Sequence, residues 1–481
     1  MAPSHKPEIN HEYDQNLLEI YNKSKNFELR HLAFNPAGKP TEWRINIVSM
    51  GGVAYEFSEQ LLRELRGDKT LKEMNIYHRV KRVHGKNGVE EVHPDEGNVK
   101  MYNDLVQMMQ DEHFPTVDKD LEKLGDPIEY RTLDDLGKMI CNTQPNIGDI
   151  TVIMGRYDFS FEDRSKGQAI GEGRPMDPDD PKDAKVLESL FHNSVYGYGR
   201  HGDLKGTIDR LTHDRNTIDS IITQMVNDYG LDPKRGRDLK ETILGIRELA
   251  KAMRGYDGHV IMATNQIDTT SYVFAKEAHI DPLRVTGFSH VDQTRYTHYF
   301  KKKLSSSRSK SVFMPIVGPH NNFITPVKER SYVGKESIMK DKELAELDHS
   351  DIKQETVEFG LKLLEKRRTS DKDAPKAFVA HVKSIMLENY SNDRVVRASI
   401  PFKNKEFYTG VPVEFDHGIP QTTFYCKEIG KKMSLSDILS TMGEDESEVF
   451  NRGNQMQLDI NTRLMEEGII SHEWNIPKPD P

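Results

Sequence analysis

The stretch 44-RINIVSMGGVAYEFSEQLLREL-65 sets the fold class of this chain. Its first part, 44–52, is a short apolar run with β-branched residues that ends in two glycines, which is typical of a buried strand followed by a tight turn. Its second part, 53–65, repeats apolar residues at helical spacing. Strand, glycine turn and helix, in this order, open a parallel βαβ unit of the kind that binds dinucleotides.

Later segments continue the alternation of strands and helices and then change to strand pairs. The segments expected to be regular are strands at 149–155 and 258–265, helices at 208–229, 237–254, 351–369 and 375–390, a strand pair at 395–402 and 405–415, and a last helix at 446–467. We therefore predict an α/β protein, with a Rossmann-type parallel sheet domain followed by an α+β substrate domain. The predicted divisions are an N-terminal arm (1–40), the dinucleotide-binding domain (41–265) with a polar insertion at 161–207, and the substrate domain (266–481).

The composition of the 481-residue chain narrows the classes of protein. Charged residues make up 30% and hydrophobic residues 36%, and no apolar run reaches about 18 residues, so we expect no membrane span. The first residues lack the apolar segment of a secretory signal. A net charge of −10 argues against a nucleic-acid-binding protein, whose surface is normally basic. The two cysteines form no CxxC pair, which excludes a zinc ribbon or a disulfide framework and fits a reducing cytoplasm.

Several short motifs follow one another in a fixed order. The sequence 210-RLTHDRN-216 begins with Arg210, the strand at 258–265 ends at Asn265, Asp292 and Arg295 stand three residues apart in HVDQTRYTHYF, and His320 follows a glycine in GPHNN. This order and spacing resemble the lactate/malate dehydrogenase family, and most closely its cytosolic-type malate dehydrogenases. The similarity runs from residue 44 to residue 467, with large insertions.

The resemblance implies an enzyme that interconverts a 2-hydroxy acid and a 2-oxo acid, with malate and oxaloacetate as the first candidates. Removing the hydroxyl proton needs a base that titrates near neutral pH, and the resemblance gives this role to His320. Asp292 would orient the imidazole and stabilise its charged form. Arg295 would bind the substrate carboxylate through two parallel hydrogen bonds. Outside this context, Asp292 and Arg295 would suit an ordinary ion pair on a helix surface.

Further residues complete the implied site. Arg210 would move in with its loop and polarise the substrate carbonyl, whereas its alternative is an exposed helical arginine. Asn265 would hydrogen-bond the substrate or the nicotinamide region. Gly51, Gly52 and Ala54 would let the backbone approach a pyrophosphate at the N-terminus of the first helix. No metal ligands are expected.

The sequence departs from the family pattern at several places. Ser49 stands where the family has its first glycine, and Gln266 replaces a proline. The insertion at 161–207 makes the active-site loop far longer than that of the family. Three arginines in this region compete for the role of the family's other loop arginine: Arg156, Arg164 and Arg200.

The cofactor implied by the resemblance is NAD. The family's acidic residue that holds the adenosine ribose has no clear counterpart, and the expected second strand, 74–83, carries Arg79, Lys81 and Arg82 instead. These three are either solvated charges or a binding site for the 2′-phosphate of NADP. We expect NAD, with NADP as the open alternative.

Two other interpretations remain open at this point. The altered glycine turn and the insertions suit a relative that has lost or changed its activity and serves as a structural or assembly subunit. A glycosidase that borrows NAD would need a Cys/His metal site, and no histidine that would match Cys141 is evident in the sequence. The expected partners are a small 2-hydroxy or dicarboxylic acid and, by resemblance, a second copy of the chain in a homodimer. The expected location is the cytoplasm.

Overall fold

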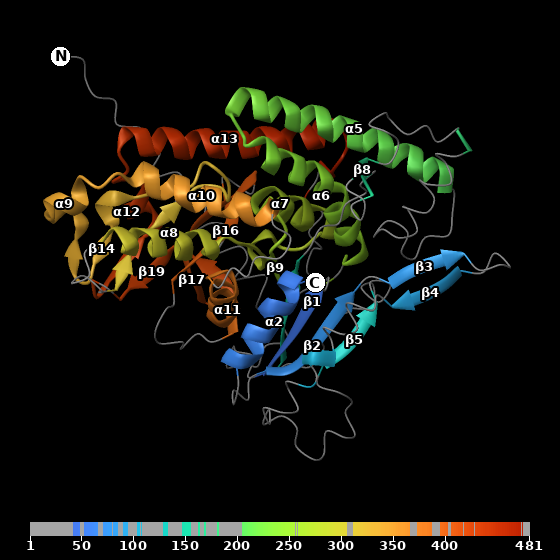
Figure 1. Cartoon of the computed structure of the whole chain (residues 1–481), viewed down its shortest axis with the longest axis horizontal. Coiled ribbons are helices and arrows are strands. Elements are labelled where there is room, and N and C mark those ends of the chain that lie inside the picture. Colours follow the sequence, from blue (N-terminus) through green and yellow to red (C-terminus); the bar gives the residue numbers. More distant parts are fainter. Residues whose placement is uncertain are drawn as a thin grey trace, which may run out of the picture.

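A nine-stranded mixed sheet forms the framework of the protein in the computed structural model (Figure 1). The strands in spatial order are β18 (Ile419–Gln421), β17 (Phe407–Asp416), β16 (Val396–Phe402), β10 (Val285–Phe288), β9 (His259–Met262), β6 (Ile147–Ile153), β1 (Glu42–Val48), β2 (Leu71–His78) and β5 (Ile128–Thr132). The strands from β10 to β5 are parallel to one another, and β16, β17 and β18 are antiparallel to their neighbours.

The residues whose structure is described are 42–48, 52–65, 71–78, 80–84, 90–94, 103–105, 107, 128–132, 147–154, 162–163, 168–169, 180–181, 204–254, 256, 258–304, 311–365, 373–386, 395–402, 406–416, 418–427, 429–472 and 474. The predicted N-terminal arm, most of the insertion at 161–207 and the residues Ser49, Gly51, Arg79 and Cys141 lie outside these ranges.

The parallel half of the sheet has the strand order of a Rossmann fold. From β1 the chain moves outward through β2 to β5 on one side, and then returns to place β6, β9 and β10 on the other side. The direction of progression therefore reverses between β1 and β6, and in such sheets ligands bind in the crevice at the carboxyl ends of these two strands. This confirms the predicted fold class. The sheet also continues past residue 265, because β10 and the strands β16 to β18 belong to it.

Helices cover both faces of the sheet (Figure 1). One face carries α2 (Gly52–Glu64), α8 (His290–Lys303) and α11 (Asp373–Met386), and α11 packs against both of the others. The opposite face carries α5 (Leu204–Tyr229), α6 (Pro233–Ala252), α7 (Ile267–Ala278) and α13 (Glu444–Glu466). The other α-helices whose bounds are given in the described ranges are α9 (Lys342–Ala345), α10 (His349–Glu365) and α12 (Leu435–Leu439).

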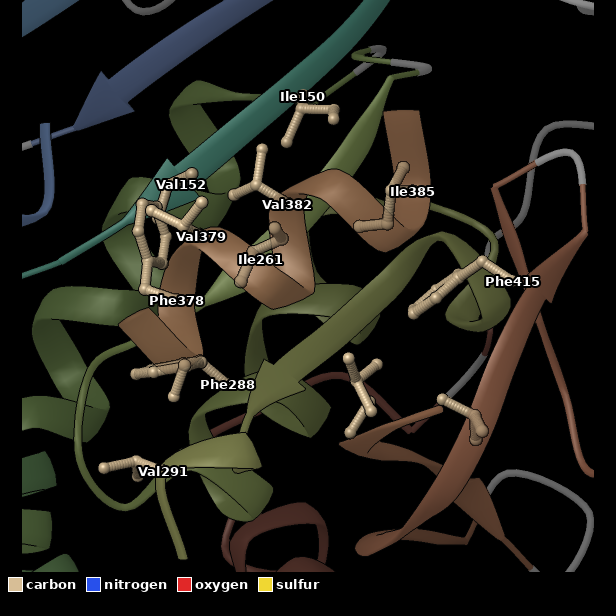
Figure 2. Close-up of a cluster of buried hydrophobic side chains, with 14 of the residues drawn as sticks. Ile150, Val152, Ile261, Phe288, Val291, Phe378, Val379, Val382, Ile385 and Phe415 are labelled. Carbon is tan, nitrogen blue, oxygen red and sulfur yellow. The ribbon is translucent and has the colours of Figure 1, made fainter. Parts of the chain in front are cut away.

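Burial on both faces explains why the central strands are rich in apolar residues. In β1, Ile45 and Ile47 point into the core under α2 and α11, whereas Val48 joins the core under α5 and α6. Figure 2 shows the first of these cores, in which Phe378 and Val382 of α11 face side chains of the parallel strands such as Ile261. Parallel strands covered by helices on both sides are expected to read as continuous hydrophobic runs.

Most of the predicted elements are found near their expected bounds. The helices expected at 208–229 and 237–254 are α5 and α6, and the strand pair expected at 395–402 and 405–415 is β16 with β17. The prediction of a second strand at 74–83 is wrong about where the strand ends. The strand is β2, which stops at His78, and the chain then forms a separate hairpin of β3 (Val80–His84) with β4 (Glu90–Pro94).

Short two- and three-stranded sheets lie beside the main one. They pair β7 (Glu162–Asp163) with β8 (Gln168–Ala169), β12 (Ile316–Val317) with β13 (Thr325–Pro326), β19 (Thr423–Cys426) with β20 (Lys431–Ser434), and β14 (Tyr332–Val333) with both β11 (Val312–Phe313) and β15 (Glu336–Ser337). Within the described ranges, no helix combines the length and the hydropathy that crossing a membrane requires.

Candidate active site

A tight turn between β12 and β13 carries His320. The turn begins at Gly318, whose φ of +100° lies in the region that favours glycine. A Cβ at this position would lie 2.6 Å from the backbone oxygen of Phe323, so any side chain here would collide with the other arm of the turn. Gly318 thereby fixes the path of the backbone immediately before His320.

The imidazole of His320 meets the carboxylate of Asp292, which lies in the first turn of α8. The distance from Nδ1 to Oδ2 is 2.7 Å, and the two residues are only 6% and 5% exposed. Burial alone would raise the pKa of Asp292, but the charges of His320 and Arg397 outweigh it and hold that pKa well below its ordinary value. The carboxylate is therefore an acceptor, and Nδ1 of His320 carries the hydrogen. In the neutral ring, Nε2 then presents its lone pair and can act as a base.

The backbone of His320 is also held on both sides. Its N–H donates to Oδ2 of Asp268 in α7 at 2.6 Å, and its carbonyl accepts from Nη1 of Arg235 in α6 at 3.3 Å. Asp268 receives a second hydrogen bond from Oγ of Ser399 in β16, at 2.5 Å. Burial raises the pKa of Asp268, although these two hydrogen bonds oppose the shift. Helices α6 and α7 and strand β16 thus all bear on the placement of one histidine.

Arg295 lies one helical turn beyond Asp292 on α8 and is also buried. Its guanidinium stacks over the ring of Phe359 in α10, 5.2 Å from the ring centre. Such a contact restricts the planar group while leaving its edge able to form parallel hydrogen bonds. The structure therefore rules out the exposed surface ion pair that the local sequence also allowed for Asp292 and Arg295.

Arg235 is a further cation near His320 that the sequence motifs did not indicate. Helix α6 begins with Asp232 as its N-cap, which accepts hydrogen bonds from the N–H groups of Lys234 and Arg235, and Pro233 occupies the first turn. Arg235 is 4% exposed, and its Nε has no hydrogen-bond partner among the described residues. Burial lowers the pKa of this guanidinium, Asp292 opposes that shift, and Arg295 adds to it. The two arginines and the carboxylate therefore act on one another electrostatically.

The other expected site residues are placed less closely around His320. Asn265 is half-buried between β9 and α7, and its carbonyl accepts a hydrogen bond from Oγ1 of Thr242 in α6 at 3.1 Å. Arg210 lies on the exposed side of α5, and no described contact joins it to His320. Gly52 begins α2 and Ala54 is buried in its first turn, directly after β1. The roles expected for these residues stay predictions.

Arg397 is the second residue that sequence reasoning missed. It lies in β16, and its Nη1 donates to Oδ2 of Asp292 at 2.5 Å. The only signal in the sequence is a charged residue inside the apolar run of a predicted strand. Among the described residues, no group of three or more His, Cys, Asp or Glu side chains is arranged to hold a metal ion.

Comparison with known proteins places the chain in a family. The chain is 32% identical to malate dehydrogenase of Thermoproteus tenax over 243 residues, which are 48% of this chain and 72% of that enzyme. It is also 32% identical to malate dehydrogenase of Pyrobaculum calidifontis over 174 residues, 35% of this chain and 54% of the relative. The chain spans about half the length of several relatives that it matches.

Solved structures agree with the fold. Malate dehydrogenase of Cryptosporidium parvum superposes with a TM-score of 0.52 at 15% identity, covering 88% of this chain and 99% of the other. No family model matches the sequence. The resemblance to the cytosolic type within the family stays a prediction. By its similarity to the Thermoproteus enzyme and its Rossmann sheet, the chain is a member of the lactate/malate dehydrogenase family.

Proposed function

We propose that the protein is an NAD(P)-dependent oxidoreductase that interconverts a 2-hydroxy acid and a 2-oxo acid, with malate and oxaloacetate as the first candidates. The observation that carries this proposal is the buried pair of His320 and Asp292, joined at 2.7 Å. This contact favours one tautomer of the imidazole and leaves Nε2 as the nitrogen that can act as the base. The family relation supports a hydroxy-acid dehydrogenase as the general class.

In the oxidation, Nε2 of His320 takes the proton of the substrate hydroxyl, so an O–H bond breaks and an N–H bond forms. The ring becomes an imidazolium, and the adjacent carboxylate of Asp292 stabilises its charge. In the reverse direction, the imidazolium returns the proton to the carbonyl oxygen of the 2-oxo acid. Burial of both residues strengthens their electrostatic interaction relative to water.

Arg295 supplies the group that would hold the substrate carboxylate. Its planar guanidinium can donate two parallel hydrogen bonds to a carboxylate, which fixes the substrate relative to His320. Arg235, with an unpartnered Nε among the described residues, adds a second positive charge in the same region. Two buried guanidinium groups suit a substrate with two carboxylates, and several of the relatives are named malate dehydrogenase.

A nicotinamide dinucleotide, when bound, supplies the acceptor for the hydride that leaves the substrate carbon. The fold offers a suitable place, because the chain reverses its direction of progression between β1 and β6. Gly52 and Ala54, at the start of α2, are the residues expected to line the pyrophosphate, together with Gly51 and, toward the nicotinamide, Asn265. NAD is proposed ahead of NADP on the family relation alone. A homodimer and a cytoplasmic location are likewise proposals.

The test is a substrate screen with the purified protein. Oxidation of NADH and of NADPH is followed with oxaloacetate, pyruvate and longer 2-oxo acids, in parallel with the variant His320→Asn. We expect turnover with a 2-oxo acid that the variant loses, and dinucleotide binding that the variant keeps. Binding of neither dinucleotide at millimolar concentration would instead favour a structural or assembly subunit.

A further inference from the structure

Arg397 lies beneath the proposed site as a fully buried charge. The residue is 1% exposed in β16, and its side chain is among the largest fully buried ones in the described part of the protein. Removing a guanidinium from water is costly unless every donor finds an acceptor. The contacts of Arg397 therefore indicate what this charge is placed to do.

The donors of Arg397 join three segments of the site. Nε donates to the carbonyl of Ile316 in β12 at 3.2 Å, and Nη1 donates to the carbonyl of Ser289 at 3.0 Å, just before α8. Nη1 also reaches Oδ2 of Asp292 at 2.5 Å, and Nη2 donates to the carbonyl of Gly318 at 2.5 Å. Arg397 thus holds both the helix that carries Asp292 and the turn that carries His320.

The neighbouring strand leaves space for this side chain. Gly410 of β17 pairs with Ser399 of β16, and its N–H donates to the carbonyl of Gly318 at 3.1 Å. A Cβ at Gly410 would lie 2.4 Å from Nη2 of Arg397 and 2.9 Å from the oxygen of Gly318. A larger residue at 410 would therefore meet the guanidinium before it meets the turn.

We propose that Arg397 is a positioning residue that sets the protonation balance of the His320–Asp292 pair and holds the His320 turn against β16. The proposal rests on the proposed function. Its physical basis is that Arg397 and His320 share one oxygen, Oδ2 of Asp292. Because a permanent cation already takes part of the carboxylate's charge, the imidazolium gains less from Asp292 than it would from an unshared partner. Removing Arg397 would return that share of the carboxylate's charge to the imidazolium.

Other charged groups surround the pair, and none duplicates this contact. On α8, Arg295 interacts with Asp292 as a charge, and Nδ1 of His290 accepts the backbone N–H of Arg397. Burial and the charge of Arg397 lower the pKa of His290 to about 4, so this ring is neutral near pH 7. From α6, Arg235 reaches the carbonyl of His320, and from α7, Asp268 binds its N–H. In the described part of the chain, Arg397 is the one cation shown to donate a hydrogen bond to Oδ2 of Asp292, the oxygen that also contacts Nδ1 of His320.

The experiment compares Arg397→Met with Arg397→Lys and uses two measurements. The first is the pH dependence of kcat/KM, and the second is the exchange of the His320 ring C2 hydrogen with deuterium, followed by mass spectrometry across pH. For Arg397→Met we expect both pH midpoints to rise by about one unit, the low end of what a charge this close produces. We expect Arg397→Lys to stay near the wild-type midpoints, because it keeps the charge. Its kcat should fall about tenfold, or about 1.4 kcal/mol, because an ammonium cannot replace the fork that holds Gly318.

A second route avoids deleting the buried charge. Gly410→Ala leaves Arg397 in the chain and pushes its guanidinium away from the site, so the midpoints should rise by less than in Arg397→Met. Gly443→Ala is the matched control, because a Cβ there has no atom within 4 Å. Thermal melting establishes that each variant is folded. If Arg397→Met does not fold, Gly410→Ala decides the electrostatic part of the proposal and Arg397→Lys decides the role in holding the turn.

Wild-type midpoints in a folded Arg397→Met or Gly410→Ala protein would overturn the electrostatic part of the proposal. A wild-type kcat in Arg397→Lys would overturn the role in holding the turn. The exchange measurement needs no turnover, so it reports on Arg397 even if no substrate is found. Failure of the proposed function would appear separately, as wild-type protein that neither binds a dinucleotide nor reduces a 2-oxo acid.

Discussion

Nδ1 of His320 and Oδ2 of Asp292 lie 2.7 Å apart although the two residues are 28 positions apart in the chain. Asp292 is placed by the first turn of α8, and His320 is placed by the turn between β12 and β13. Two independent elements therefore have to hold their places for the imidazole to keep one tautomer. This dependence makes the pair sensitive to conservative substitutions.

Replacing His320 by Asn should lower kcat by at least about 100-fold, because the side chain can no longer exchange a proton with the substrate. Dinucleotide affinity should stay at the wild-type value, as measured by fluorescence titration. His213→Asn, on the exposed side of α5, serves as the control. Near-normal turnover in His320→Asn would refute the proposed role.

Replacing Asp292 by Asn should cost about 100-fold to 10,000-fold in kcat. The amide can donate to Nδ1, which favours the tautomer that carries its hydrogen on Nε2 and so blocks the base. Steady-state kinetics with the exposed variant Asp209→Asn as control gives the comparison. Equal kcat values for the two variants would show that the carboxylate is not needed.

Replacing Arg295 by Lys keeps the charge but loses the two parallel hydrogen bonds and the stacking on Phe359. We expect a large fall in kcat/KM for 2-oxo acids, with little change in dinucleotide affinity. Arg452→Lys, on an exposed part of α13, is the matched control. A fall in kcat/KM smaller than about threefold corresponds to less than about 1.4 kcal/mol of transition-state stabilisation. Such a result would show that Arg295 is a structural residue.

A comparison of Arg235→Met with Arg210→Met shows which of these two arginines assists the reaction of the substrate. Arg235 is buried against the His320 carbonyl, whereas Arg210 is exposed on α5. We expect the larger loss of kcat/KM in Arg235→Met, provided that thermal melting shows it to be folded. A larger loss in Arg210→Met would favour the original expectation that the α5 arginine reaches the substrate.

Stability should fall on mild acidification because several histidines are buried in neutral form. Burial lowers the pKa of His259 to about 3 and that of His290 to about 4. In the unfolded chain these rings have a pKa of about 6.5, so below that pH the unfolded state binds more protons than the folded state. The free energy of unfolding should therefore decrease as the pH drops from about 6.5 toward 4.

Thermal melting at pH 7 and pH 5 tests this dependence. His259→Gln should reduce the difference in Tm between the two pH values, since it removes one of the groups that must stay neutral. His213→Gln, which changes an exposed histidine, should leave the difference unchanged. An unaltered difference in His259→Gln would contradict the assignment of the acid sensitivity to this buried ring.

The sequence predicted the fold well where hydrophobic periodicity and order along the chain carry the information. The strand and helix at 44–65, and the juxtaposition of His320 with Asp292, are both found. The end of the second strand was not predictable from periodicity, because apolar residues recur at Tyr77, Val80 and Val83 with no glycine or proline to mark the point where the chain leaves the sheet.

Arg235 and Arg397 could not be identified from the sequence for a different reason. Each acts through contacts to backbone carbonyls of residues far away in the chain, 85 positions for Arg235 and 79 for the Arg397 bond to Gly318. Carbonyl groups occur at every residue, so no pattern of side chains marks the partner. The sequence marks Arg397 only by its place inside an apolar predicted strand, and the partners of both arginines appear only in the tertiary arrangement.

The continuity of the main sheet has a mechanical consequence. Strand β10 is hydrogen-bonded to the parallel strand β9 on one side and to the antiparallel strand β16 on the other. Backbone hydrogen bonds therefore cross directly from the parallel half of the sheet into the antiparallel half, which carries Arg397. Bending between the halves would have to break those bonds, so the two cannot swing as separate lobes. Calorimetry should accordingly record one cooperative melting transition for the core of the molecule rather than two.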